Sequence, residues 1–313
     1  MRKFNFLYCH DSGYNLQTYV SIFSFLKQMK NSELNIYILH KEPETFNDYK
    51  DKLKKFENIN KIEIYKFNKD LSHFPNLNKK HVSEATYYRL FISEFLPENL
   101  KKIIYVDSDV LCINNPEVDF ENTFEDLDKF SKTIAVYPEI IKESKDHDLF
   151  SNLELQYDKY FNAGVMFINF EKWVNEVNPP DILNLVELYR EKIIFWDQDI
   201  LNKYFDGNFL EINNNLNFSI QSSIPVDSFI NYAKLIHYAG NHKPWNIEAG
   251  CEDSSTIFFD LYQELNLGYY FFTRKSRRIK TFVSIMSDIF SLKLFKTKYP
   301  MKYMIEALKT MTS

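Results

Sequence analysis

The chain has little glycine and cysteine and no long apolar segment, and these absences exclude several classes of protein. Its 313 residues include 6 Gly and 3 Cys. The cysteines, Cys9, Cys112 and Cys251, form no C-x-x-C pair, which argues against a disulfide framework and a structural zinc site. No uncharged run reaches the ~18 residues that a membrane-spanning helix needs, and no apolar secretion signal follows Met1. We therefore expect a cytoplasmic protein in a reducing compartment, without a transmembrane anchor.

Short β-prone runs alternate with helical patterns along most of the chain. The abundant aromatic residues, 29 Phe and 21 Tyr, are interpreted as core packing. Strands are expected at 4–9, 34–39, 62–67, 102–106, 132–137, 164–169 and 235–238, and helices at 16–29, 44–56, 83–95, 180–192 and 197–205. Such alternation is typical of βαβ units around a mainly parallel sheet with flanking helices, so the predicted fold class is α/β.

The C-terminal segment differs in charge from the rest of the chain. Residues 274–313 contain ten Lys or Arg and two acidic residues, a local charge of +8, although the whole chain has a net charge of −5. Its apolar residues recur at helical spacing, first at Phe282, Ile285, Met286, Ile289 and Phe290, and beyond Pro300 at Met301, Met304, Ile305 and Leu308. We expect one domain over 1–268 and basic amphipathic C-terminal helices over 269–313.

This basic tail has two alternative interpretations. Helices that are apolar on one side and basic on the other are typical of segments that lie on an anionic membrane. Terminal helices that pack on their own domain and keep a solvated basic face give a similar pattern. We favour peripheral binding to the inner face of the cytoplasmic membrane. We expect no nucleic acid, because the acidic remainder of the chain would repel phosphates.

The most informative motif is an apolar β-prone run, Ile103–Val106, that ends in Asp107-Ser108-Asp109. In open α/β sheets, ligands bind in the crevice outside the carboxyl ends of the strands. Two carboxylates at that position can hold a hard divalent cation against a diphosphate. The triplet alone is a weak signal, because Asp is also common in turns and helix N-caps. Other segments of the chain make the signal specific.

Five further segments accompany the two aspartates, namely Tyr8–Tyr14, His81–Leu90, Tyr160–Val165, Trp196–Asn202 and His237–Trp245. In this order, they resemble the retaining glycosyltransferases of family 8, which include glycogenin and bacterial lipopolysaccharide galactosyl- and glucosyltransferases. The resemblance covers about residues 4–250. Its most diagnostic part is the spacing of His237, Gly240 and Lys243 before Pro-Trp in the last segment.

The resemblance implies a GT-A type, Rossmann-like fold and a UDP-hexose donor. The residues that match the family's donor site are Asp11, Tyr14, Arg89, Asp107, Ser108, Asn162, Ala163, Asp197, Gln198, Gly240 and Lys243. Gly13 departs from the pattern, in which Asn is usual. The implied metal ligands are Asp107, Asp109 and His237. The implied cation is Mn²⁺, with Mg²⁺ as the alternative, because an imidazole ligand favours a transition metal over Ca²⁺.

Physical chemistry gives several of these positions a role. Gly240 lets the backbone approach the diphosphate because it has no side chain, and Lys243 adds a positive charge there. Asp197 and Gln198 are the predicted catalytic residues. The first would bind sugar hydroxyls, and the second would lie near the anomeric carbon, whose configuration the family retains. Asp199 is interpreted as a structural residue near a helix N-terminus.

We therefore expect a metal-dependent retaining hexosyltransferase that moves galactose or glucose from a UDP-sugar to a glycan or lipid-linked glycan acceptor in lipopolysaccharide, capsule or other surface-glycan synthesis. Two alternatives remain. A sugar-1-phosphate nucleotidyltransferase opens with a Gly-rich loop carrying a basic residue, whereas residues 8–16 contain only Gly13 and no Lys or Arg. A non-catalytic sugar-nucleotide-binding module is the other alternative, against which the intact Asp107, Asp109, His237 and Lys243 argue.

Overall fold

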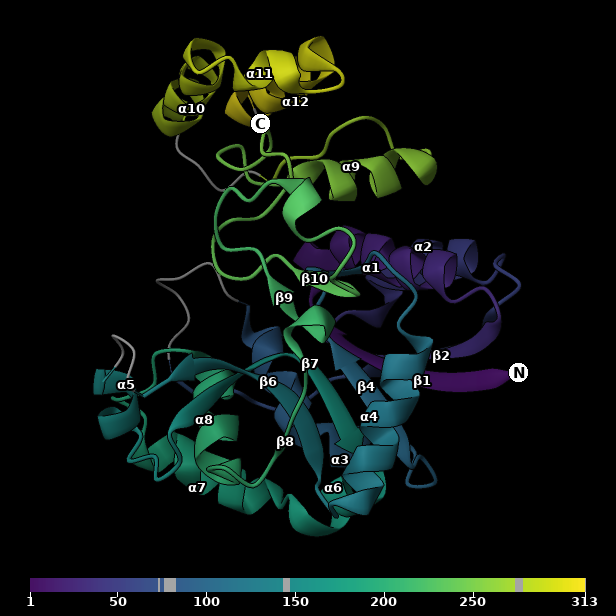
Figure 1. Cartoon of the computed structure of the whole chain (residues 1–313), viewed down its shortest axis with the longest axis vertical. Coiled ribbons are helices and arrows are strands. Elements are labelled where there is room, and N and C mark those ends of the chain that lie inside the picture. The colour runs from purple at the N-terminus through teal and green to yellow at the C-terminus, as the bar shows by residue number, and fades with distance from the viewer. Residues whose placement is uncertain (73, 76–82, 143–146, 274–277, 313) are drawn as a thin grey trace.

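The central feature of the fold is a seven-stranded sheet with helices on both faces (Figure 1). The computed structural model describes residues 1–72, 74–75, 83–142, 147–273 and 278–312. The strand order is β3-β2-β1-β4-β7-β6-β8. These strands are β1 (Arg2–His10), β2 (Ser32–His40), β3 (Ile59–Lys66), β4 (Lys102–Val106), β6 (Ile134–Ile141), β7 (Lys159–Asn169) and β8 (Leu210–Glu211). A second sheet, in the order β5-β10-β9, consists of β5 (Val110–Cys112), β9 (Phe218–Ser219) and β10 (Leu235–His237).

The direction of β7 determines which residues meet at the edge of the sheet. β1 is parallel to β2 and β4, β2 to β3, and β6 to β8, so the predicted mainly parallel sheet is confirmed. β7 is antiparallel to its neighbours β4 and β6. The first half of β7 therefore lies beside the carboxyl end of β4, and the backbone N–H of Asp107 donates to the carbonyl of Gly164 at 2.8 Å.

Alternate residues of β4 pack against opposite layers of helices. Ile103 and Tyr105 join the core under α6 (Phe170–Glu176), α7 (Pro179–Leu188) and α8 (Trp196–Phe205). Ile104 and Val106 join the core under α1 (Asn15–Gln28), α2 (Asn47–Leu53) and α4 (Glu117–Lys129). A strand that is buried on both faces reads as a continuous apolar run, which explains why β4 is recognisable in the sequence.

The segment expected as a helix over 83–95 is mostly a 3-10 helix. It forms the 3-10 helix η3 (Glu84–Phe91) followed by the short helix α3 (Ile92–Phe95). Side chains three residues apart eclipse one another in a 3-10 helix. Thr86 and Arg89 therefore project from the same side, and the Nε of Arg89 donates to the Thr86 carbonyl at 3.2 Å. The first residues of the motif, 81 and 82, lie outside the described residues.

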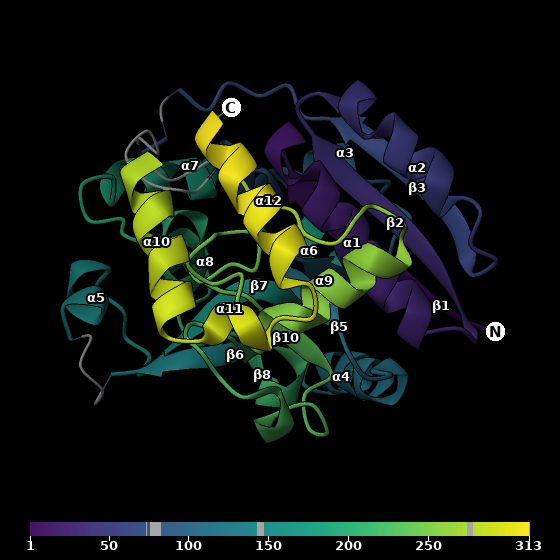
Figure 2. The same cartoon turned by 90° about the horizontal axis from the view of Figure 1, so that it is seen from above.

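The C-terminal helices pack against the segment that follows β10. α10 (Arg278–Phe290), α11 (Lys293–Lys296) and α12 (Pro300–Thr312) lie above α9 (Ser255–Glu264) at one end of the molecule (Figure 1), and Figure 2 shows them from above. Buried side chains of these helices join the core formed by Trp245, Ile247, Phe258 and Phe272; they are Ile285, Leu294, Tyr303 and Ala307. The predicted basic helices are thus present over 278–312, while 274–277 lie outside the described residues, and the boundary at 268 stays a prediction.

Candidate functional site

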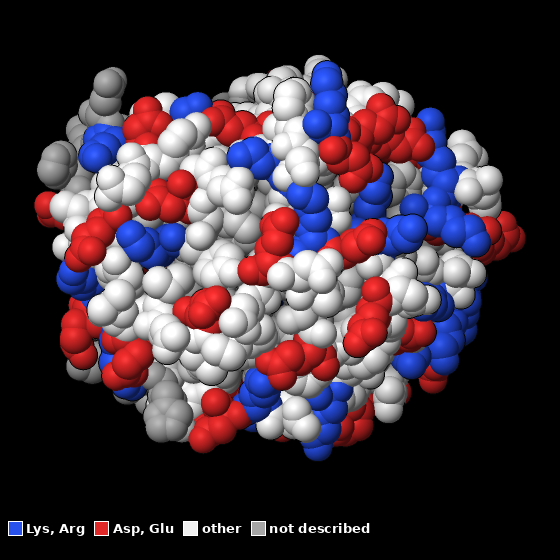
Figure 3. All heavy atoms as spheres, turned by 90° about the horizontal axis from the view of Figure 1, so that it is seen from below, with Lys and Arg blue, Asp and Glu red and all other residues white. Residues whose placement is uncertain are grey.

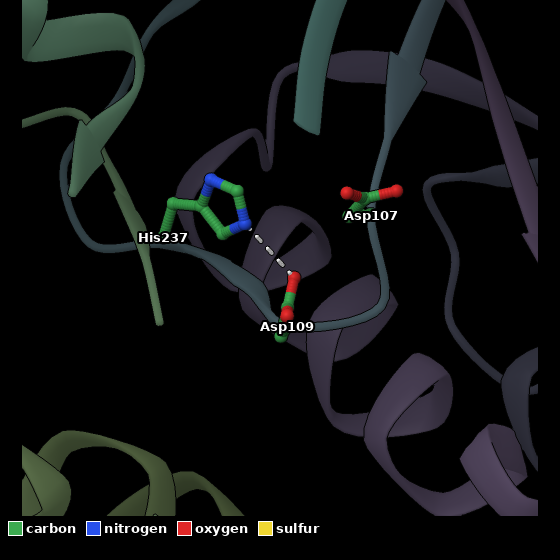
Figure 4. A group of neighbouring side chains, drawn as sticks. All are labelled: Asp107, Asp109 and His237. Atoms are coloured by element: carbon green, nitrogen blue, oxygen red, sulfur yellow. Dashed lines mark ion pairs between the residues drawn. The ribbon is translucent and has the colours of Figure 1, made fainter. Parts of the chain in front are cut away.

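Two neighbouring strands bring the predicted metal ligands together. Asp107 and Asp109 lie in the turn between β4 and β5, which the N–H of Val110 closes by donating to the Asp107 carbonyl at 3.1 Å. β10 pairs antiparallel with β5, so that His237 lies opposite Val110. One carboxylate oxygen each of Asp107 and Asp109 and a ring nitrogen of His237 lie within 4.8 Å of one another (Figure 4). We call these three residues the metal cluster.

The carboxylate of Asp109 is suited to binding a cation. Its Oδ1 faces the Nε2 of His237 at 3.2 Å and has no other hydrogen-bond partner among the residues described. Its Oδ2 contacts the ammonium of Lys243. Burial raises the pKa of Asp109, but the charges of Lys243 and His237 outweigh burial and lower it well below its usual range. The donor set of two carboxylates and one imidazole fits a divalent cation.

Arg89 connects the metal cluster to Asp197. The buried guanidinium places Nη2 3.3 Å from Asp107 Oδ1 and Nε 2.6 Å from Asp197 Oδ2. Nη1 donates to the carbonyl of Ala163 at 2.5 Å, and the Tyr105 ring lies under the guanidinium at 4.3 Å. Burial lowers the pKa of Arg89, but the two carboxylates outweigh it and raise the pKa. The structure therefore places Arg89 where it fixes the separation of Asp107 and Asp197.

The predicted catalytic residues lie in the first turn of α8. Asp197 contacts the hydroxyl of Thr86 as well as Arg89, and burial raises its pKa to about 6 against the opposing effect of Arg89. Gln198 accepts a hydrogen bond from the Ala163 N–H at 2.9 Å, and its Nε2 donates to the Tyr160 hydroxyl at 3.2 Å. The carboxamide of Gln198 is thus held next to Ala163, and two segments predicted to line the sugar pocket meet.

Asn162, next to Ala163 in β7, is held by three hydrogen bonds. Its Oδ1 accepts from the N–H of Gly164 at 2.9 Å and from the Nδ2 of Asn217 at 3.0 Å. Its Nδ2 donates to Glu139 at 3.0 Å. We call Asn162, Ala163, Asp197 and Gln198 the sugar cluster.

The segment predicted to bind uracil and ribose follows β1. Asp11 Oδ1 accepts from the N–H of Gly13 at 2.9 Å, and its Oδ2 contacts the Ser83 hydroxyl. The Tyr14 ring packs edge-to-face on Trp245, with ring centres 6.2 Å apart. The first and last motif segments are therefore in contact.

The remaining predicted donor residues border the metal cluster. The hydroxyl of Ser108 hydrogen-bonds that of Thr18 in α1 at 2.7 Å. Gly240 is exposed and has a φ of +66°, and a Cβ there would have no neighbour within 4 Å, so the backbone conformation explains this glycine. The ammonium of Lys243 contacts Asp109 and the carbonyl of Tyr238. Lys243 therefore lies at the metal cluster itself in this structure.

Sequence reasoning did not identify three residues that support the site, namely Thr86, Gly164 and Asn217. A Cβ on Gly164 would collide with the imidazole of His237, so the glycine makes room for that ring. Gly164 belongs to the motif segment Tyr160–Val165, and a glycine inside a predicted strand was the signal that could have identified it. Asn217 belongs to the asparagine-rich stretch 213–217, in which no spacing distinguishes it.

A sheet with an acidic cluster at the carboxyl end of β4, next to a group of hydrogen-bonded amide side chains, is the architecture of a GT-A glycosyltransferase. Residues 5–249 match the family described as Glycosyl transferase family 8, and the chain belongs to this family. The family predicted from the motifs is thereby confirmed.

Relatives and solved structures support this assignment. The chain is 29% identical over 250 residues to Lipopolysaccharide glucosyltransferase WaaO of Escherichia coli, covering 72% of this chain and 68% of the relative. It is 28% identical over 256 residues to an E. coli lipopolysaccharide 1,2-glucosyltransferase, covering 77% and 72%. The galactosyltransferase LgtC, solved with donor and acceptor sugar analogs, has the same fold, with a TM-score of 0.69, 22% identity, and coverage of 83% of this chain and 95% of LgtC.

The packing of Gly164 against His237 leads to a first prediction. In Gly164→Ala the new methyl group would displace the imidazole, so we expect Mn²⁺ affinity, measured by electron paramagnetic resonance, to fall about tenfold or more, as when the support of a metal-ligating histidine is lost. The variant should also unfold at lower urea concentration, because overpacking the site lowers the free energy of unfolding by about 1–3 kcal/mol.

A double-mutant cycle with His237→Ala tests the cause of that loss. Removing the imidazole removes the group that the methyl strikes, so Gly164→Ala should cost much less stability in this background. An equal cost in both backgrounds would show that the methyl group disturbs something else.

Proposed function

We propose that this chain transfers galactose or glucose from a UDP-sugar to a glycan acceptor of surface-glycan synthesis, using Mn²⁺ and retaining the anomeric configuration. The observation that carries the proposal is the ion-pair link through Arg89 between the metal cluster and the sugar cluster. A UDP-hexose has a diphosphate for the first cluster and a ring of hydroxyls for the second. The lipopolysaccharide glucosyltransferases similar to this chain support a hexose as the transferred group.

The metal cluster and Lys243 would share the diphosphate. Asp107, Asp109 and His237 would hold the cation, which supplies positive charge to the UDP leaving group. In the structure the Lys243 ammonium compensates the buried charge of Asp109. A cation bound to Asp109 would repel this ammonium and leave it available to the diphosphate, a few residues beyond Gly240. Lys243 would therefore exchange one anionic partner for another when cation and donor bind.

The sugar cluster would orient the hexose. Thr86 and Arg89 each occupy one oxygen of Asp197, and an ionised carboxylate accepts about four hydrogen bonds, so sites remain for sugar hydroxyls. Gln198 is neutral, and Ala163 and Tyr160 fix its carboxamide. A carboxamide is a weak nucleophile, so this residue would position the anomeric carbon for attack by the acceptor on the face that UDP leaves.

The metal assignment is tested with Asp109→Asn. An amide cannot replace the charge of the carboxylate, so we expect Mn²⁺-dependent UDP binding by calorimetry to be lost. Release of UDP from UDP-hexose should fall by about two powers of ten, the loss typical of removing one preorganised electrostatic contact. Asp181→Asn, on the exposed side of α7, is the matched control and should behave as the wild type. Full activity of Asp109→Asn in the presence of EDTA would contradict the proposal.

The exchange of partners by Lys243 predicts two opposite effects of one substitution. Lys243→Ala removes a charge-assisted contact to the diphosphate worth about 1.5–3 kcal/mol, which corresponds to one to two powers of ten in UDP affinity. The substitution also removes the ammonium group that contacts Asp109. Mn²⁺ alone should therefore bind more tightly. Calorimetry with UDP and resonance titration with Mn²⁺ measure the two separately. A parallel loss of both affinities would show that the lysine only supports the fold.

We further propose that the C-terminal helices dock on an anionic membrane that carries a lipid-linked acceptor. Their buried residues anchor them to the domain, yet both helical faces predicted from the sequence remain partly exposed. The exposed apolar side chains of these helices and of the turn between α10 and α11 are Ile279, Phe282, Val283, Phe290, Leu292, Phe295, Met301, Ile305 and Leu308. None of the helices in the described part of the chain is both long and apolar enough to cross a bilayer.

The charge of the C-terminal helices also supports the proposed membrane-binding surface. Exposed lysines accompany the apolar residues on α11, α12 and the connection between them; they are Lys296, Lys298, Lys302 and Lys309. The face at the opposite end of the molecule instead has acidic and basic side chains intermixed (Figure 3). Attraction to anionic lipid is worth about 1 kcal/mol for each basic residue near the surface.

Vesicle sedimentation tests the membrane proposal. Phe295→Ser combined with Met301→Ser should reduce binding to phosphatidylglycerol vesicles, while hydrolysis of the UDP-sugar without acceptor stays at the wild-type rate. Binding of the wild type should weaken in high salt, because exposed charges are screened. Leu188→Ser, an exposed apolar residue on α7, is the control. Unchanged sedimentation of the double variant would contradict the proposed surface.

A further inference from the structure

A buried asparagine connects the metal cluster to the sugar cluster. Asn217 is 1% exposed, and its Oδ1 lies 3.0 Å from the Nδ1 of His237 while its Nδ2 lies 3.0 Å from the Oδ1 of Asn162. It directly precedes β9, and β9 is parallel to β10, with Ser219 opposite His237. This pairing places the Asn217 side chain behind the imidazole, on the side away from Asp109.

The backbone N–H of Gly164 fixes the direction of the hydrogen bonds that run from Asn162 through Asn217 to His237. The N–H of Gly164 can only donate, and it lies 2.9 Å from the Asn162 Oδ1. That atom must therefore be the carbonyl oxygen of Asn162, and the Asn217 group that faces it must be the NH₂. The same assignment lets the Nδ2 of Asn162 donate to the carboxylate of Glu139.

The orientation of Asn217 then determines the tautomer of His237. With its NH₂ turned to Asn162, Asn217 presents Oδ1 to the imidazole, so the Nδ1 of His237 must carry the hydrogen. In the neutral ring, the Nε2 lone pair then points at the Asp109 Oδ1, 3.2 Å away. Two lone pairs at that distance repel each other unless a proton or a metal cation lies between them, and Nε2 is the nitrogen that a metal at Asp109 would need.

We propose that Asn217 is a positioning residue that fixes the tautomer and ring orientation of His237 for metal binding and, through Asn162, links occupation of the metal cluster to the sugar cluster. The proposal rests on the metal role of Asp109 and His237 proposed above. Groups that hydrogen-bond the second nitrogen of a metal-bound histidine typically affect metal affinity about 10–100-fold.

Two substitutions separate the two contacts. Asn217→Leu removes both while keeping a similar shape, so Mn²⁺ affinity without nucleotide, by electron paramagnetic resonance, should fall about 10–100-fold, and UDP-hexose affinity should fall with it. Asn217→Asp still accepts from the Nδ1 of His237 but turns a carboxylate oxygen toward the Asn162 Oδ1. Because the contact to Nδ1 is kept, the Mn²⁺ affinity of this variant should stay within about threefold of the wild-type affinity, a difference of roughly 0.6 kcal/mol. Its UDP-hexose affinity should still fall.

Nitrogen-15 NMR of histidine reads the tautomer directly and does not depend on activity. In the wild type without metal, the Nδ1 of His237 should carry a hydrogen, whether or not Nε2 is also protonated, and in Asn217→Leu a form with the hydrogen on Nε2 alone should appear. Asn58→Ala is the control, because Asn58 is a buried asparagine with two hydrogen bonds, to the carbonyls of Leu26 and Met29, remote from the site. It should lose stability and keep both Mn²⁺ affinity and tautomer.

The outcomes distinguish this proposal from the metal assignment. If Asp109→Asn abolishes Mn²⁺ binding while Asn217→Leu leaves it unchanged, the metal assignment stands and the positioning role is wrong. A wild-type His237 whose Nδ1 carries no hydrogen overturns the tautomer argument whatever the affinities. If Asn217→Leu does not fold, the wild-type NMR measurement and the split between the two affinities in Asn217→Asp still decide.

Discussion

The site depends on one buried guanidinium placed between two carboxylates. Asp107 belongs to the metal cluster and is partly buried, whereas Asp197 belongs to the sugar cluster and is buried, where an isolated charge would be costly. Arg89 compensates both and also donates to the carbonyl of Ala163. Because its planar fork holds several partners in fixed directions, the separation of the two clusters follows from the position of one side chain. The 3-10 geometry of η3 adds Thr86 as a second contact to Asp197.

The reversed direction of β7 is the second constraint on the site. In a purely parallel sheet the strand next to β4 would present its last residues to the site. Since β7 is antiparallel, it presents the segment around Asn162 and Gly164 instead. Gly164 can then approach the imidazole of His237 closely, and its N–H orients the amide of Asn162. A single strand reversal thus places the sugar cluster beside the metal cluster.

The sequence predicted six of the seven strands of the main sheet and the two aspartates of the metal cluster, because these leave a local pattern, whereas His237 and the other motif segments came from the family resemblance. β4 is an apolar run buried on both faces, and the aspartates follow it directly. The roles of Arg89 and Lys243 in the structure were not predictable, because they depend on which charge lies across from them after folding. The contacts of Asn217 were even less predictable, since it stands 55 residues from Asn162 and 20 from His237 and belongs to no motif. Its importance arises only from the pairing of β9 with β10.

The C-terminal helices show where helical periodicity stops being informative. Apolar spacing predicted one face over Phe282–Phe290 and another over Met301–Leu308, but it does not state which partner a face meets. In α12 the buried contacts to the domain come from Tyr303 and Ala307, which lie outside the predicted face, whereas Met304 of that face packs against the same core and is only partly buried. The hydroxyl of Tyr303 donates to the carbonyl of Ile247. The predicted face of α12 remains largely exposed beside lysines. The two interpretations of the tail are therefore compatible, because one side of each helix can anchor to the domain while another stays open to a lipid surface.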